Sequence, residues 1–165
     1  MKTIKVLLLL TGLSISSMVF GSSAPATVLT PEQKEKVDDN KLLAAAKSGV
    51  LKRAQTALRR GANIKATDKD GWIALDLAAH NGHVAVVSLL LQSGADIKAI
   101  NRHGSTALHV AASNGHVTVV KLLLDNKADI NTRSMHGSTA FHHAARNGHV
   151  AVVKLLLDNK ADICK

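Results

Sequence analysis

The chain has 165 residues, 46% of them hydrophobic, which suits one domain of ordinary size or a short array of repeats. Aromatic residues make up only 2%, which argues against a base-stacking nucleic-acid platform and against an aromatic-lined small-molecule pocket. The formal net charge is +9, and the single cysteine, Cys164, excludes an internal disulfide and a cysteine-based zinc site. The nine histidines are the one feature of the composition that suggests chemistry.

Residues 1–26 have the three-part pattern of a secretory signal peptide. Lys2 and Lys5 precede 15 uncharged residues, 6–20, and small residues follow. This apolar run is shorter than the about 20 residues that a membrane-spanning helix needs. We therefore expect a secreted or periplasmic protein, with cleavage between residues 21 and 26. The alternative is an uncleaved segment that anchors the protein in a membrane, the only case in which we expect membrane contact.

A short linker and the start of a helix are expected over residues 27–34. Thr30 can cap this helix, Pro31 suits its first position, and Gln33 can complete a capping box. The helix would lead directly into the main domain.

A 33-residue repeat covers most of the remaining chain. Gly71, Gly104 and Gly137 are 33 residues apart, and the same spacing separates pairs of alanines and triplets of leucines. The period defines a degenerate capping unit, 35–67, and three full units, 68–100, 101–133 and 134–165. Only four of 27 aligned positions differ between residues 104–130 and 137–163.

Each unit predicts two short helices. In residues 101–133, Ser105 or Thr106 can cap the first helix, Leu108, Ala111 and Ala112 share one face, and Gly115 suits the left-handed turn that ends it. The second helix is apolar around most of its circumference, so we expect neighbouring units to bury both of its sides.

Residues 103–131, HGSTALHVAASNGHVTVVKLLLDNKADIN, closely resemble the ankyrin repeat. The resemblance extends over about 130 residues. It implies an all-α solenoid of helix-turn-helix units joined by β-hairpin loops, with about three full repeats and a degenerate N-terminal one. A signal peptide ahead of such repeats suggests a bacterial origin by analogy.

The resemblance also implies where a partner protein would bind, because ankyrin-like arrays use their hairpin tips and the groove face of each first helix. Transferred position by position, the candidate protein-binding residues are Lys69, Asp70, Trp72, His80, Arg102, His103, Ser105, Ser113, Arg133, Met135, His136, Ser138 and Arg146. Trp72 is the best single candidate, since tryptophan is enriched among interface hot spots and its place beside Gly71 predicts exposure. The alternative is that Trp72 packs locally over the degenerate unit.

Repeat position accounts for most of the histidines. His83, His116 and His149 share one position, and His109 and His142 share another, so we expect these five to hold turns by hydrogen bonds. His109 and His142 each follow a threonine by three residues and can bond to it on one helix face. The unit 68–100 has Ile73 and Asp76 in place of this pair, and His143 occupies a position that is apolar in the other units.

Motifs typical of enzymes are missing: there is no Gly-x-Ser-x-Gly, no glycine-rich phosphate loop and no His-Glu-x-x-His. We therefore expect a non-enzymatic protein-binding module with no catalytic residue, cofactor or metal, and no nucleic-acid partner. One alternative is a self-assembling array joined through the apolar helix 150–158. A less favoured one is a metal site at His143 with His109 or His149, which lacks a carboxylate or cysteine to complete it.

The basic charge is concentrated in one part of the sequence. Residues 31–67 hold nine basic and four acidic residues, a net charge of +5, whereas residues 68–165 carry only +2. This pattern is typical of a solvated cap that keeps a repeat array soluble. It would also suit attraction to an acidic protein or to an anionic membrane surface.

Overall fold

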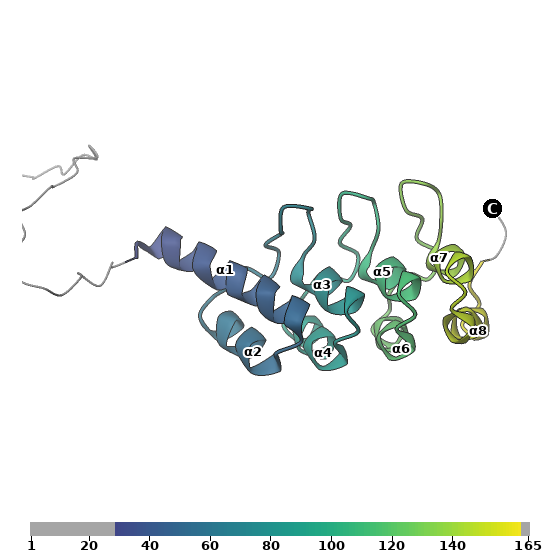
Figure 1. Cartoon of the computed structure of the whole chain (residues 1–165), viewed down its shortest axis with the longest axis horizontal. Coiled ribbons are helices and arrows are strands. Elements are labelled where there is room, and N and C mark those ends of the chain that lie inside the picture. Colours follow the sequence, from purple (N-terminus) through teal and green to yellow (C-terminus); the bar gives the residue numbers. More distant parts are fainter. Residues whose placement is uncertain (1–28, 163–165) are drawn as a thin grey trace, which may run out of the picture.

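The computed structural model describes residues 29–162, in which eight helices pair into four units that stack side by side (Figure 1). The helices are α1 (Pro31–Ser48), α2 (Leu51–Arg59), α3 (Ala74–His80), α4 (Val84–Gln92), α5 (Ala107–Ser113), α6 (Val117–Asp125), α7 (Ala140–Arg146) and α8 (Val150–Asp158). This part of the chain has no strand beyond an isolated β-bridge between Thr67 and Ile73. The predicted all-α repeat solenoid is confirmed, whereas the predicted signal peptide and Cys164 lie outside the described residues.

The odd-numbered helices form an inner layer and the even-numbered helices an outer layer. Each inner helix contacts the outer helix of its own unit and the next inner helix, and α2, α4, α6 and α8 contact one another in turn. Three hairpins between units, residues 67–73, 100–106 and 133–139, project from the same side of the array (Figure 1). None of the helices between residues 29 and 162 combines the length and apolar character that a membrane crossing requires.

The first helix begins as the sequence predicts. The Thr30 hydroxyl accepts the backbone N–H of Gln33 (3.3 Å), and the Gln33 side chain accepts the backbone N–H of Thr30 (3.0 Å). Gly49, in the left-handed conformation with φ 74°, ends the helix. With 18 residues, α1 is far longer than the seven-residue helices α3, α5 and α7, so it extends beyond the rest of the stack at the N-terminal end (Figure 1).

The core lies between the two layers. The paired alanines of α1, α3 and α5, such as Ala111 and Ala112, are fully buried because their small side chains let the helices approach closely. Val119, Val120 and Leu123 of α6 are also 0% exposed. Neighbouring units cover both sides of α6, as predicted, because α6 contacts α4 on one side and α8 on the other. Val117, at the start of α6, remains 37% exposed.

A histidine joins each unit to the one before it. At the joint between the second and third units, His116 Nε2 donates to the carbonyl oxygen of His80 at 2.8 Å. A Cβ added to Gly82 would lie only 2.7 Å from His116 Nδ1, so the imidazole packs directly on this glycine. We call this arrangement the His–Gly joint. It is repeated by His83 with Lys47 and Gly49, and by His149 with Ser113 and Gly115.

The His–Gly joint refines the prediction that these histidines hold turns. Each of the three histidines makes a hydrogen bond, as predicted. The carbonyl that accepts this bond belongs to the preceding unit and not to the histidine's own turn. These histidines are therefore structural links between repeats.

Candidate functional site

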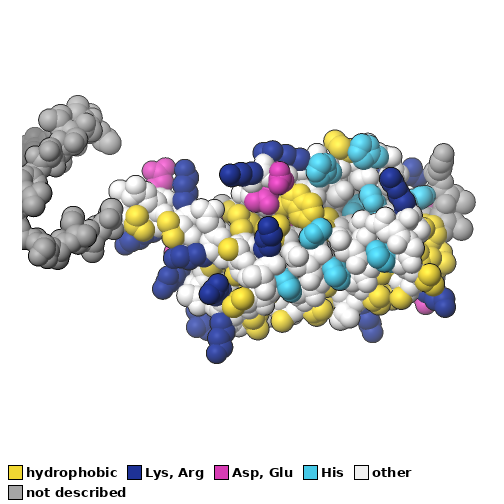
Figure 2. All heavy atoms as spheres, in the orientation of Figure 1, with side chains coloured by type: hydrophobic (Ala, Val, Ile, Leu, Met, Phe, Trp, Pro, Cys, Tyr) yellow, Lys and Arg dark blue, Asp and Glu magenta, His cyan; other side chains and the backbone are white. Residues whose placement is uncertain are grey.

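A hollow of about 360 Å³ lies between the hairpins and the inner helices of the three full units. Six of the thirteen predicted protein-binding residues line it: Trp72, His80, His103, Ser105, Ser113 and His136. The other lining residues are Asn101, His109, Val110, Asn114, Ser134 and His143. We call this hollow the concave groove. Histidine side chains gather on the middle and right of the face seen in Figure 2, in agreement with this composition.

The hairpins on the rim of the groove are built by the first residue of each unit. The backbone N–H of Asn101 donates to the Ser105 carbonyl (3.0 Å), and Asn101 Oδ1 accepts the backbone N–H groups of His103 (2.9 Å) and Ser105 (3.1 Å). Asp68 makes the corresponding bonds in the first hairpin. Asn101 Oδ1 accepts hydrogen bonds within the hairpin, whereas Nδ2 of the same side chain has no partner in the described part of the chain.

Three buried polar atoms that belong to groove residues have no hydrogen-bond partner in the described part of the chain. They are Asn101 Nδ2, Ser134 Oγ and His143 Nε2. A buried polar group without a partner costs about 1–3 kcal/mol. These atoms are closed to solvent, so a ligand would reach them after a small movement of the side chains that cover them, and acceptors and donors on that ligand would then recover this free energy.

The floor of the groove also holds two histidines, His109 and His143, whose pKa values are lowered. His109 Nδ1 accepts the Thr106 backbone N–H (3.2 Å) and lies 2.9 Å from Thr106 Oγ1, which confirms the predicted Thr–His pair. The ring proton of His109 is therefore on Nε2, which donates to the Ser138 carbonyl at 3.2 Å. Burial lowers the pKa of His109, and the ring of His143, 5.6 Å away, lowers it further. Burial and the charge of Arg146 likewise lower the pKa of His143.

One wall of the groove is formed by Trp72 and His80. Their ring centres are 5.3 Å apart, in an edge-to-face arrangement. His80 is exposed towards the groove, as predicted. Trp72 differs from the expectation of free exposure: its side chain is half-buried and packs against the hydrophobic core. Part of the Trp72 side chain thus packs on the hydrophobic core, and only the remainder faces the groove.

The other seven predicted residues do not line the groove. Six are exposed on or near the hairpins and at the end of α7: Lys69, Asp70, Arg102, Arg133, Met135 and Arg146. Ser138 is half-buried, and its carbonyl accepts hydrogen bonds from Ser134 and His109. The structure therefore divides the predicted set into residues that line the groove and residues that lie outside it, on the hairpins and at the end of α7.

Ser113 lines the groove, but its polar atoms bind within the array. Its carbonyl accepts Asn147 Nδ2 (2.7 Å) and His149 Nε2 (2.9 Å), and its hydroxyl accepts Asn147 Nδ2 (2.9 Å). Ser113 therefore serves the contact between the second and third full units.

The sequence did not place Asn101, Ser134 and Asn114 in the groove, nor His109, Val110 and His143. The signal for the first two is the 33-residue spacing of Asp68, Asn101 and Ser134, because each opens a hairpin. Asn114 donates to the Val110 carbonyl (2.8 Å) and to His80 Nδ1 (3.1 Å), a contact that appears only when two units stack.

No three histidine, cysteine, aspartate or glutamate side chains within residues 29–162 lie close enough together to hold a metal ion. A sequence model of the family described as "Ankyrin repeats (3 copies)" matches residues 26–101, 42–134 and 98–165, which together span the whole repeat region. No significant match to a curated protein was found.

Proposed function

Because the chain belongs to the ankyrin-repeat family, whose members are generally protein–protein interaction modules and typically not enzymes, we propose that it is an exported protein that binds a partner protein non-covalently. The partner would occupy the concave groove and contact the hairpins beside it. Affinity would come from a few anchoring contacts, as in most protein interfaces.

The observation that carries this proposal is the set of unpartnered polar atoms in the groove, Asn101 Nδ2, Ser134 Oγ and His143 Nε2. A polypeptide segment offers carbonyl oxygens and N–H groups that suit these atoms. The exposed part of Trp72 adds apolar contact at one end, beside His80. Since the groove is lined by side chains of three stacked units, it would be formed before the partner arrives.

Ser134→Ala is the sharpest test of the groove. The substitution removes a buried hydroxyl that has no partner within the described chain, so the free protein should keep or raise its melting temperature while it loses a contact to the partner. We expect about tenfold weaker binding, which corresponds to about 1.4 kcal/mol. The assay is calorimetric titration of the purified protein with a partner identified by cross-linking and mass spectrometry.

Thr118→Ala is the matched control, because it removes an exposed hydroxyl from the outer helix α6, where the next unit has Ala151. It should leave binding unchanged. Equal affinity of Ser134→Ala and the wild type would contradict the groove assignment. Trp72→Ala is a less direct test, since the half-buried ring also packs on the core and its loss should lower the melting temperature.

Export is the second part of the proposal and rests on the charge and apolar pattern of residues 1–26. N-terminal sequencing of the protein recovered from its native compartment tests it directly. A mature chain beginning between residues 22 and 27 would support export with cleavage. A chain that retains Met1 and remains with the membrane would favour the anchored alternative.

A second candidate function is self-association through the end of the array formed by α7 and α8. Here Val150 and Leu157 are 63% and 44% exposed, and Ala145 is exposed although its counterpart Ala112 is buried. Light scattering tests this candidate. Val150→Lys should shift a dimer towards monomer, whereas Val117→Lys, at the same position of the preceding unit, should not. A monomer at high concentration of the wild type would remove the candidate.

A further inference from the structure

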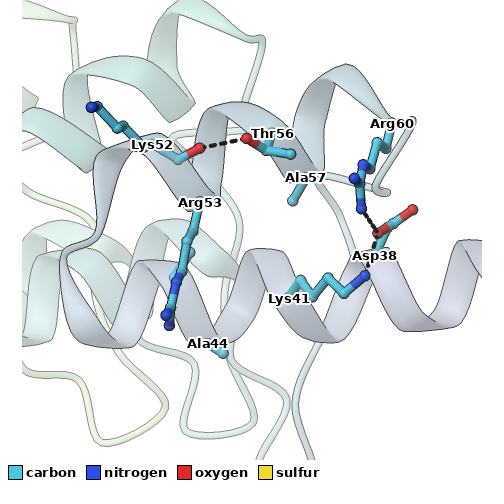
Figure 3. A pocket seen from close by; sticks show the side chains of 9 residues that line it. Asp38, Lys41, Ala44, Lys52, Arg53, Thr56, Ala57 and Arg60 are labelled. Atoms are coloured by element: carbon cyan, nitrogen blue, oxygen red, sulfur yellow. Dashed lines mark hydrogen bonds and ion pairs between the residues drawn. The ribbon is translucent and has the colours of Figure 1, made fainter.

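A second hollow lies between α1 and α2 (Figure 3). These two helices are at the opposite end of the array from α7 and α8 (Figure 1). Its volume is about 420 Å³, within the range of roughly 300–1,000 Å³ that is usual for ligand sites. Small side chains, among them Ala44 and Ala57, form part of its lining. We call it the α1–α2 hollow. It shares no lining residue with the concave groove, so the two sites are separate.

The α1–α2 hollow is surrounded by cations. Lys41, Lys52, Arg53 and Arg60 line it together with one acidic residue, Asp38, so these five side chains carry a net charge of +3. Lys and Arg side chains also dominate the left end of the face in Figure 2, over α1 and α2. Such a field attracts anionic groups, most strongly at low ionic strength.

Two of the four cations are already held by the carboxylate. Asp38 Oδ1 lies 3.2 Å from Lys41 Nζ and 3.9 Å from Arg60 Nη1, and the Asp38 side chain is only 13% exposed. Lys52 and Arg53 are exposed and form no ion pair within residues 29–162. Figure 3 shows Arg53 reaching from α2 across the hollow towards Ala44 of α1, while Lys52 points away from the Asp38 cluster.

We propose that the α1–α2 hollow binds a short acidic segment of a partner protein. Carboxylates of the segment would pair with Lys52 and Arg53, and the guanidinium of Arg53 can bind a carboxylate through two parallel hydrogen bonds. A small apolar side chain between two acidic residues would rest on Ala44. The Asp38 cluster would hold α1 and α2 at the separation that keeps the hollow open.

The shape of the site favours a protein segment over a membrane surface. A membrane-binding surface combines cations with large apolar side chains that enter the lipid. None of the large hydrophobic residues that are exposed in the described part of the chain lines this hollow. Its apolar atoms are recessed between two helices, where a narrow chain can reach them and a flat bilayer cannot.

Binding of a labelled ten-residue peptide of alternating Glu and Ala, measured by fluorescence anisotropy with the purified protein, tests the proposal. The corresponding Gln and Ala peptide is the neutral control. We expect the double variant Lys52→Gln, Arg53→Gln to bind the acidic peptide at least tenfold more weakly. The matched control is Lys36→Gln, Arg59→Gln, which removes the same charge from exposed positions of α1 and α2 outside the hollow.

A second pair of variants tests the hollow by shape. Ala44→Glu places a bulky anion at an exposed position beside Arg53 and should abolish binding of the peptide. Ala85→Glu adds the same group at an exposed position of α4 and should have no effect. Circular dichroism tests whether each variant is folded. If Ala44→Glu is unfolded, the proposal is judged from the glutamine double variants alone.

Three results would overturn the proposal. The acidic peptide could fail to bind. Both glutamine double variants could weaken binding equally, which would indicate attraction by net charge alone. Vesicles of phosphatidylcholine and phosphatidylglycerol could bind through Lys52 and Arg53 while the acidic peptide does not, which would assign the hollow to a lipid surface.

Discussion

Asp76 is a buried carboxyl group in the position that histidine occupies in the next two units, and we predict that Asp76→Asn stabilises the protein in a pH-dependent manner. Asp76 is 1% exposed. Its Oδ2 accepts the Ile73 backbone N–H (3.3 Å), whereas its Oδ1 has no partner in the described chain. Burial raises the pKa of Asp76 to about 7, and the charge of Asp68 adds to the rise, which the bond from Ile73 partly offsets.

The magnitude follows from proton linkage. Because the folded pKa lies above the ordinary value of 3.8, the carboxyl group contributes its stability below pH 3.8 and loses it as the pH rises towards 7. Between pH 5 and pH 8 this loss amounts to about 2.5 kcal/mol, taking ~1.36 kcal/mol for each pKa unit. Asparagine does not titrate. The advantage of Asp76→Asn over the wild type should therefore grow by about 2.5 kcal/mol between these two pH values.

Urea denaturation followed by circular dichroism, at both pH values, measures this difference. The histidines His109 and His143, whose pKa values are lowered, contribute in the opposite sense and lose stability as the pH falls below 6.5. Their effect is common to both proteins and cancels in the comparison. Asp125→Asn, at an exposed position of α6, is the control and should show no such trend. A pH-independent effect of Asp76→Asn would refute the reasoning.

Two further predictions concern the joints and the caps of the repeats. Gly82→Ala and Gly148→Ala both place alanine at a left-handed position, but only Gly82 lies against an imidazole, that of His116. We therefore expect Gly82→Ala to lower the free energy of unfolding by at least ~1 kcal/mol more than Gly148→Ala does. Equal losses in urea denaturation would argue against the His–Gly joint. Thr106→Ala breaks the buried contact with His109 and should cost about 1–2 kcal/mol, whereas Ser105→Ala should change the melting temperature little.

The fold could be predicted from the sequence because each structural position occurs several times at one spacing. The left-handed Gly115 recurs as Gly49, Gly82 and Gly148, and the bond between Thr106 and His109 recurs between Thr139 and His142, so a feature read in one unit predicts its counterparts. The start of α1 could be predicted equally well, because a capping box depends only on residues close together in the sequence.

The residues that line the candidate sites were harder to predict from the sequence, because the sites depend on contacts between helices and between units. Asn101 Nδ2 and Ser134 Oγ meet in one groove only after two hairpins are brought side by side. Trp72 is half-buried because its ring packs against the hydrophobic core and lies edge-to-face with His80, contacts that form only in the folded array. The basic charge of residues 31–67 is visible in the sequence, but the α1–α2 hollow depends on the distance between two helices.

The His–Gly joint has a direction, and this bears on how such a chain can lengthen during evolution. Each full unit brings the imidazole that fits the unit before it and the glycine and carbonyl that receive the unit after it. A tandem copy of 33 residues therefore arrives with both halves of the contact, and no second substitution is needed to join it. The near identity of residues 104–130 and 137–163 is the expected trace of such a duplication. Insertions of other lengths would break the contact, so the array can grow or shrink only in whole units.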